Sequence, residues 1–395
     1  MRNKPQQQRF SHQNTSHSIR KKMKEICIFC GARPNFMKVA PLIRAIENYN
    51  REGHDVPYSL VYAGPEGDLT LEPILFADLQ IAKPGTFLGV DCENLNELTG
   101  QVMTKFERYL QLHPTQTVVV VDDLASTMAA AIVTKKQGVT LAHIAAGTRS
   151  FDINMPKEIN RLVIDGLSDI LFTAGISNNN IANKAGTELS KVYMVGNILM
   201  DNLRFNHQRI AAMPLPEEAA AFIAPPTAGS RPTPYLVFTL NRKALLANTH
   251  NLRLMVNAIE DVAGRFGAPV LAPLRKEARQ TILPMLSPDS PIHPIQPQPY
   301  LTFSKLTAQA AGIITDSGNV AEEASFNGVP CITLNSYTEH VETVTVGTNV
   351  LVGEAPETLK LSLQNMLSGQ WKDGSIPDRW DGRSGERVLH ILLEA

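Results

Sequence analysis

The segment TDSGNVAEEA, residues 315–324, joins a short polar turn to the start of a helical pattern. Ser317 and Gly318 fall at the predicted helix start, where free backbone N–H groups and the helix dipole favour an anion. Ser317 adds a hydroxyl, and Gly318 lets a phosphate approach the backbone. Glu322 and Glu323 follow about one turn later, within reach of ribose hydroxyls. The segment predicts a phosphate site, but an ordinary capped helix with acidic residues in its first turn explains it about equally well.

Two cations follow the first apolar run of the chain. The residues GARPNFMK, 31–38, form a glycine turn that opens a helical pattern, and they include Arg33 and Lys38. Cations at the carboxyl end of a strand suit negative charge bound across a cleft. A loop with two solvated cations is the common alternative, so this motif indicates a phosphate contact only together with others.

A third polar stretch runs from His143 through Arg161. Pro156 suits the first position of a helix, which places Glu158 and Arg161 on its first turns. These residue types can transfer protons or bind anions. Helix capping with a surface ion pair is the alternative interpretation.

Short apolar runs alternate with helical patterns from Glu25 onward. Most runs are rich in Val and Ile without polar alternation, as expected of strands buried on both faces of a parallel sheet. The first half predicts strands at 25–30, 58–63, 117–122, 139–143, 169–173 and 191–195, and helices at 35–48, 93–111, 125–136, 156–166, 176–186 and 198–211. This succession indicates a doubly wound sheet.

A proline-rich stretch, 212–234, separates this series from a second one and indicates a hinge or linker. The second series predicts strands at 235–239, 268–272, 291–295, 311–315, 329–334 and 348–352, and helices at 249–266, 275–285, 299–309, 318–327, 355–369 and 385–394. Ligands bind beyond the carboxyl ends of the strands in such sheets. Two sheets joined by a hinge therefore predict a ligand cleft between two domains.

Composition excludes several classes of protein. The chain has 395 residues, enough for two α/β domains, with 43% hydrophobic and 19% charged residues. A formal net charge of -1 gives no overall basic field for nucleic acid. No apolar run is long enough to predict a membrane span. Residues 1–24 carry Arg and Lys but no acid and lack an apolar signal segment, so we expect a disordered basic tail; translation starting at Met23 is an alternative, and a nucleic-acid or transit role a minor third.

In this order, these segments resemble the non-hydrolysing UDP-N-acetylglucosamine 2-epimerases over nearly the whole chain from about Ile26. The matching segments are GARPNFMK for G-T-R-P-E-x-x-K, SFDINMPKEINR (150–161) for S-F-D-x-x-M-P-E-E-I-N-R, VGN (195–197) followed by Asp201, Tyr300-Leu301-x-Phe303, TDSGNVAEEA for T-D-S-G-G-x-x-E-E-A, and Gly347-Thr348.

The resemblance implies a GT-B fold, an α/β architecture in which two Rossmann-like doubly wound parallel-sheet domains face a central cleft. It implies an N-terminal domain of residues 25–205 plus 382–395 and a UDP-binding C-terminal domain of residues 206–381. Ser317 and Gly318 would then hold the diphosphate, Glu323 the ribose, and Tyr300 with Phe303 the uracil, while Arg33 and Arg242 would face phosphate. It also implies a cytoplasmic homodimer in the supply of surface-polysaccharide precursors, with no cofactor and no metal.

The groups that perform the family's chemistry are mostly replaced. The reaction needs a base for the proton on sugar C2, together with acids and cations that let UDP leave and return. Ala145 stands for the glutamate of H-x-E-A-G, Lys157 for the first glutamate of P-E-E, and Asn241 for the histidine of T-x-H-R-R-E. Two more histidines, of T-D-H and H-P-R, are Gly166 and Ala272, the T-G-Q-H segment reads 63–66 AGPE, and the G-D aspartate is kept as Asp123.

Alanine and asparagine cannot transfer protons at neutral pH, and Lys157 reverses the local charge. One acid–base group typically accounts for about 10²–10⁴-fold in rate, so the sequence predicts little of the family's reaction.

Three functions remain in competition. The first is a UDP-sugar glycosyltransferase or hydrolase with altered chemistry and with Asp122, Asp123 or Glu158 as base. The second is a true 2-epimerase with displaced catalytic groups, for which Asp122, Asp123, Glu158 and His143 are the candidates. The third is a non-catalytic UDP-sugar sensor, or a partner subunit for an active homologue.

Overall fold

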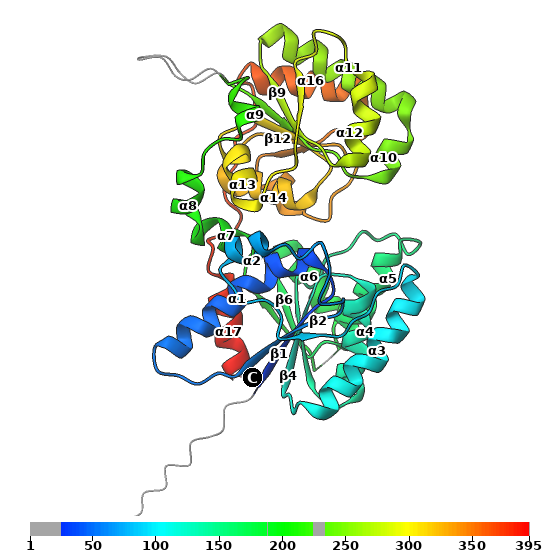
Figure 1. The fold of residues 1–395 in the computed structure, drawn as a ribbon, viewed down its shortest axis with the longest axis vertical. Helices are drawn as coiled ribbons and strands as arrows, with labels where there is room; N and C mark the ends of the chain where they lie inside the picture. Colours follow the sequence, from blue (N-terminus) through cyan, green and yellow to red (C-terminus); the bar gives the residue numbers. More distant parts are fainter. Residues whose placement is uncertain (1–24, 188, 224–233, 395) are drawn as a thin grey trace, which may run out of the picture.

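The computed structural model describes residues 25–187, 189–223 and 234–394, and the predicted tail 1–24 lies outside them. Its first sheet has seven parallel strands in the order β3-β2-β1-β4-β5-β6-β7 (Figure 1). The strands are β1 Ile26–Cys30, β2 Tyr58–Tyr62, β3 Thr86–Phe87, β4 Thr117–Val121, β5 Thr140–Ile144, β6 Ile170–Thr173 and β7 Lys191–Met194. Together with α1 to α7 and α17 they form what is called here the N-terminal unit.

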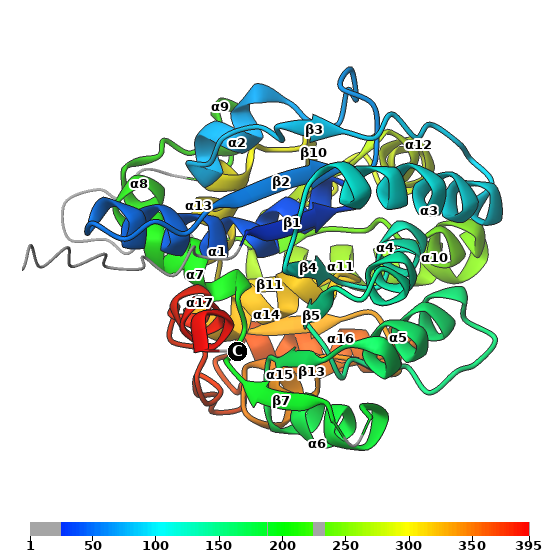
Figure 2. The same cartoon turned by 90° about the horizontal axis from the view of Figure 1, so that it is seen from below.

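Helices cover both faces of this sheet because its central strands carry mostly apolar residues on both faces. Ile28 packs into one core cluster, with α1 and α17, while Phe29 packs into another, with α3, α4 and α5. Figure 2 shows these two helix groups on opposite sides of the strands. The helices are α1 Arg33–Arg51, α2 Pro73–Leu79, α3 Leu95–Leu112, α4 Ala125–Lys136, α5 Pro156–Leu167, α6 Ile176–Ala185, α7 Leu199–Phe205 and, at the C-terminus, α17 Ser384–Glu394.

The second sheet has six parallel strands in the order β10-β9-β8-β11-β12-β13. Its strands are β8 Leu236–Phe238, β9 Val270–Pro273, β10 Ile292–Ile295, β11 Gly312–Thr315, β12 Cys331–Thr333 and β13 Asn349–Leu351. Its helices are α9 Glu217–Ala220, α10 Lys243–Ala247, α11 Thr249–Phe266, α12 Lys276–Ile282, the 3₁₀ turn Leu283–Met285, α13 Tyr300–Ala308, α14 Gly318–Asn327, α15 Val341–Thr345 and α16 Pro356–Leu367. These elements are called the C-terminal unit.

The chain returns to the N-terminal unit at its end, where α17 packs beside α1 (Figure 1). Asp201 of α7 caps α17, because its carboxylate accepts the N–H groups of Ser384 at 3.1 Å and Gly385 at 2.7 Å. Burial nevertheless raises the pKa of Asp201 to about 6. A Cβ on Gly385 would lie 2.7 Å from the Pro41 backbone, so only glycine allows this close approach of the two helices.

Helix 198–211, predicted as continuous, is divided at Asn206 into α7 and α8 His207–Ala212. The buried Asn206 amide donates to the Asn202 carbonyl at 3.1 Å, which satisfies the broken turn. The predicted domain boundary at residue 205 falls at the end of α7 and stays a prediction. Within the described residues, no helix is both long and apolar enough to cross a membrane.

Candidate functional site

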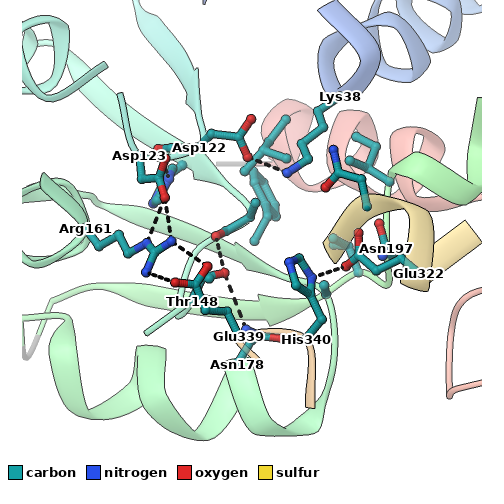
Figure 3. A pocket seen from close by; sticks show the side chains of 18 of the residues that line it. Lys38, Asp122, Asp123, Thr148, Arg161, Asn178, Asn197, Glu322, Glu339 and His340 are labelled. Carbon is teal, nitrogen blue, oxygen red and sulfur yellow. Dashed lines mark hydrogen bonds and ion pairs between the residues drawn. The ribbon is translucent and has the colours of Figure 1, made fainter. Parts of the chain in front are cut away.

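A cavity of about 240 Å³ lies between the two units. The N-terminal unit lines it from the start of α1 and from the loops that follow β4, β5, β6 and β7. The C-terminal unit contributes Asn319 and Glu322 of α14 and the segment 339–342, which leads into α15. Figure 3 shows side chains from both units pointing into this space. The cavity therefore sits where the carboxyl ends of the first sheet's strands face the second unit, as expected for open α/β sheets.

Asp123, the aspartate that follows β4, is held between two cations of α5. Its carboxylate contacts Lys157 Nζ at 3.2 Å and Arg161 Nη2 at 2.6 Å. Burial on its own favours the neutral acid, but Lys157 and Arg161 hold the pKa of Asp123 below its usual value. Asp123 is thus an ionised, doubly paired carboxylate and a weak base.

Glu158 lies one helical turn from Arg161 and is fixed from a second side. Its Oε2 accepts the N–H and the hydroxyl of Ser150, each at 2.8 Å, and contacts Arg161 Nη1 at 3.2 Å. Burial opposes ionisation, yet these donors hold the pKa of Glu158 below its usual value. Glu158 does not line the cavity, so it anchors the loop before α5.

His143 on β5 belongs to a buried ion cluster. Its Nδ1 lies 2.7 Å from Asp165 Oδ1 and its Nε2 3.1 Å from the Asp122 carbonyl. Asp165 also contacts Arg149 Nη1 at 2.7 Å. Burial opposes the charge of Asp165, but His143 and Arg149 hold its pKa below the usual value. Both ring nitrogens of His143 are therefore directed at oxygen acceptors within the protein, and neither is directed at a bound sugar.

Two residues at this sheet edge adopt left-handed backbone conformations. Asp122, after β4, has φ 60° and Ala145, after β5, has φ 68°. Such values cost of order 1 kcal/mol in a non-glycine residue and cluster at functional sites. The turn at Asp122 directs its carboxylate to Lys38 of α1, with which it forms an ion pair (Figure 3).

On the C-terminal side, α14 begins at Gly318 with Ser317 as its N-cap residue, as the sequence predicts. The space above Gly318 is filled by the ring of His340, since a Cβ on Gly318 would lie 2.3 Å from His340 Nε2. The ring is held by Glu322, whose Oε1 is 2.6 Å from His340 Nδ1. The other oxygen of Glu322 is buried and has no hydrogen-bond partner among the described residues.

Glu323 of α14 and Tyr300 of α13 lie outside the cavity lining. Burial and the charge of Glu322 raise the pKa of Glu323 to about 8. Burial also raises the pKa of Tyr300, whose hydroxyl has no hydrogen-bond partner among the described residues. Phe303 follows one turn later on α13, half-buried.

The two predicted arginines also lie away from the cavity. Arg33 is the first residue of α1 and is half-buried. Arg242 ties together three loops of the C-terminal unit: its N–H donates to Asp316 at 2.5 Å and its Nη1 donates to Asn335 at 2.7 Å. Asp316 and Asn335 follow β11 and β12, so Arg242 shapes the carboxyl edge of the second sheet.

Of the predicted site residues, the structure brings Lys38, Asp123 and His143 together in the cavity lining. It places the others outside that lining: Arg33, Glu158, Arg242, Tyr300, Phe303, Ser317, Gly318 and Glu323. Sequence reasoning missed Glu339 and His340, which follow β12 in a segment without a recognised motif. Among the described residues, no group of three or more His, Cys, Asp or Glu side chains is placed to hold a metal ion.

A direct contact joins the two units across the cavity. Arg161 forms a bidentate pair with Glu339, with Nη1–Oε1 at 2.7 Å and Nη2–Oε2 at 2.6 Å. Glu342 reaches the first turn of α6, where the Ser177 N–H donates to its Oε1 at 2.9 Å. Both carboxylates come from the segment 339–342, so this short segment makes polar contacts that hold the two units together across the cleft.

Comparison with known proteins gives one consistent result. The family model described as UDP-N-acetylglucosamine 2-epimerase matches residues 49–393. The UDP-N-acetylglucosamine 2-epimerase of Methanocaldococcus jannaschii is 32% identical over 380 residues, which cover 93% of this chain and 98% of the relative. The UDP-2,3-diacetamido-2,3-dideoxy-D-glucuronate 2-epimerase of Pseudomonas aeruginosa is 31% identical over 373 residues, covering 94% and 99%.

Solved structures give the same family and fold. The M. jannaschii UDP-GlcNAc 2-epimerase in complex with UDP-GlcNAc and UDP superposes with a TM-score of 0.78 at 30% identity, covering 94% of this chain and 100% of that one. A lipopolysaccharide outer core galactosyltransferase, at 13% identity and a TM-score of 0.52, shares the fold alone. The predicted GT-B fold is therefore confirmed. With a family match over most of its length and relatives above 30% identity, the chain belongs to the UDP-N-acetylglucosamine 2-epimerase family.

Proposed function

We propose that this protein binds a UDP-sugar in the cleft between its units and does not epimerise it at C2 by the family's proton transfer. One observation carries this proposal. The four candidate acid–base groups are all engaged: Asp122 with Lys38, Asp123 with two cations, Glu158 with Ser150 and Arg161, and His143 at both ring nitrogens. A general base must be free to reach the proton that it removes.

The replaced positions support the same conclusion. Ala145 has no ionisable group at the position where the family pattern has a glutamate. Lys157 pairs with the retained Asp123, with its Nζ 3.2 Å from Asp123 Oδ1. A carboxylate with two cationic partners would lose both ion pairs on accepting a proton, which makes it a poor base at neutral pH. We infer that transfer of the C2 proton is not supported by these side chains.

The C-terminal side supports binding of the nucleotide. The M. jannaschii relative is described in complex with UDP-GlcNAc and UDP. In this chain, α14 presents Ser317, Gly318, Glu322 and Glu323 in the order that the family pattern requires. Glu322 is buried and lines the cavity, and its unpartnered Oε2 can accept a hydrogen bond from a hydroxyl group.

Binding requires the cleft to widen. A cavity of about 240 Å³ is below the ~300–1,000 Å³ typical of small-molecule sites, so a whole nucleotide sugar needs more room. Rotation of the two units about the α7–α8 connection would supply it, because hinge motions use a few residues at element ends. We therefore propose that the ligand enters an opened form and that the segment 339–342 closes behind it.

The decisive experiment is incubation with UDP-N-acetylglucosamine in heavy water, followed by proton NMR. We expect broadening of the ligand signals and no deuterium at C2. The M. jannaschii enzyme, under the same conditions, serves as the positive control. A manno product with deuterium at C2 would contradict the proposal and restore the epimerase. Release of UDP would instead indicate the hydrolase or transferase alternative.

The family resemblance supports three further proposals: a homodimer formed through the N-terminal unit, a cytoplasmic location, and a role in nucleotide-sugar supply for surface polysaccharides. Light scattering at several protein concentrations tests the first, since an obligate dimer would keep twice the chain mass of 43.3 kDa.

A further inference from the structure

The position of His340 in the cavity lining depends on Gly318, a glycine of the predicted phosphate site. Its ring lies over the first turn of α14, and a Cβ at Gly318 would come within 2.3 Å of its Nε2. Sequence reasoning assigned this space to a phosphate. The structure puts an imidazole there, so the glycine also serves His340.

Glu322 fixes the orientation of the ring. Its Oε1 accepts from His340 Nδ1 at 2.6 Å, and Figure 3 shows the two side chains directed toward each other. Nε2 is then the free ring atom: it makes no hydrogen bond to any described residue and lies against the N-terminal turn of α14. A histidine that donates from Nδ1 to a carboxylate has a lone pair at Nε2 when it is neutral, and it donates from Nε2 when it is an imidazolium.

Charged groups face the ring from every element around it. Glu322 comes from α14, Glu339 precedes the ring in its own segment, and Lys38 comes from α1 with Asp122 behind it. Burial disfavours the imidazolium, but the charge and hydrogen bond of Glu322 hold the pKa of His340 above its usual value. The ring therefore carries a proton over a wider pH range than a free histidine.

A cation at a helix N-terminus is unfavourable by itself, because the helix dipole is positive there. Glu322 offsets this charge in the empty cleft. Its second oxygen is buried, lines the cavity and has no partner among the described residues, which indicates a missing hydroxyl or N–H donor at this place. An anion with an attached sugar would satisfy all three features at once: the α14 N–H groups, the imidazolium and the unpartnered carboxylate oxygen.

We propose that His340 is a diphosphate ligand of this protein, donating from Nε2 to a phosphate oxygen, and that Glu322 is its positioning residue. The inference rests on the proposed UDP-sugar binding and adds the residue that makes this binding depend on pH. In the alternative arrangement, His340 is a plug that must leave before the phosphate arrives. The two arrangements predict opposite effects of removing the imidazole.

The test is calorimetric titration with UDP-N-acetylglucosamine between pH 6 and pH 9. Its diphosphate is a diester and has no proton that titrates in this range, so any pH dependence that uridine does not share comes from the protein. The variants are His340→Gln, which is neutral throughout, His340→Arg, which is cationic throughout, and Glu322→Gln. Uridine, which lacks phosphate, is the matched control ligand.

We expect wild-type affinity to weaken by about 10–100-fold from low to high pH, the worth of one charge-assisted hydrogen bond. His340→Gln should bind weakly at every pH, and His340→Arg should bind well at every pH. Glu322→Gln should move the wild-type midpoint to lower pH, because the imidazolium loses its carboxylate. Uridine should show none of these differences.

Two results would overturn the inference while leaving the proposed function intact. His340→Gln could keep the wild-type affinity and pH profile, or it could bind more tightly, as a plug predicts. Failure of the wild-type protein to bind UDP-N-acetylglucosamine at any pH, with circular dichroism confirming that it is folded, would overturn the proposed function as well.

Discussion

The two walls of the cavity differ in how far their polar groups are satisfied. On the N-terminal wall, each carboxylate already has cationic partners: Asp123 has Lys157 and Arg161, and Asp165 has Arg149. The atoms left without a partner there, among the described residues, are nitrogens such as Arg149 Nη2 and Asn197 Nδ2.

On the C-terminal wall the atoms without a partner are carboxylate oxygens, Glu322 Oε2 and, just behind, Asp316 Oδ1. One wall thus offers donors and the other offers acceptors. A sugar nucleotide carries both acceptors and hydroxyl donors, so this difference suits binding. It does not suit proton abstraction, because the basic groups are neutralised on the wall that would have to act on the sugar.

The buried ion cluster of His143, Arg149 and Asp165 should make the largest contribution to stability of the contacts compared in the two walls. Asp165→Asn removes the carboxylate charge that faces His143 and Arg149, and leaves the buried Arg149 with Glu158 at 3.8 Å as its remaining counter-ion. We expect a loss of about 3–5 kcal/mol in the free energy of unfolding, the usual cost of breaking a buried ion pair. Thermal unfolding by calorimetry at neutral pH measures it.

Asp261→Asn is the matched control, because its partners Arg265 and Lys360 lie on the exposed face of the C-terminal unit. We expect no measurable change there. The pKa of Asp165 is lowered by folding, so its stabilisation is present above the unfolded pKa of about 4 and is lost as pH falls through the folded value. If Asp165→Asn loses no more unfolding free energy than the control, the buried carboxylates of the N-terminal wall are not stabilised by their cationic partners.

Much of the fold could be predicted from sequence because its signals are local. β1 is apolar at every position and β4 at every position after Thr117, which indicates strands covered on both faces. Ser317 followed by glycine gave the start of α14 correctly. The two-residue strand β3 and the short helices α2 and α15 were missed, because two to seven residues are too few to show a period.

The site was harder to predict because its decisive contacts are distant in sequence. Arg161 and Glu339 are 178 positions apart, and His340 lies 18 positions from Glu322. No local pattern signals such pairs. The sequence could say which family carboxylates are replaced, but it could not say that Asp123, which is kept, is neutralised by the replacement at Lys157.

A substitution of Glu323 tests the C-terminal side in the same way, and its expected effect on the free energy of unfolding is smaller. Burial and the charge of Glu322 raise its pKa to about 8, whereas an unfolded glutamate titrates near ~4.3. A raised pKa means that its stabilisation is complete below the unfolded value and is lost as pH rises through the folded value. Wild-type stability should therefore fall between about pH 5 and pH 8, by about 3 kcal/mol.

Glu323→Gln has no titrating group at this position, so its melting temperature should fall less than that of the wild type over the same range and exceed the wild-type value at pH 8. Calorimetry of both proteins at four pH values gives the difference directly, since titration of every other group is common to both. Parallel curves would mean that Glu323 is ionised in the folded protein, and the C-terminal wall would then resemble the N-terminal one.

The smallest expected effect concerns the contact that joins the two walls. Glu339→Gln removes the charge that pairs with Arg161, while Arg161 keeps Asp123 and Glu158 as partners. The loss should be about 1 kcal/mol, because Glu339 is partly exposed to water. That is enough to change the ratio of closed to open molecules about fivefold.

Small-angle scattering of ligand-free Glu339→Gln should show a larger radius of gyration than that of the wild type. Glu354→Gln, which changes an exposed glutamate of the C-terminal unit, is the control and should have the wild-type radius. Equal radii for Glu339→Gln and wild type would mean that packing of α7 and α14, and not the ion pair, holds the cleft closed. In that case the difference between the walls would have no part in domain movement.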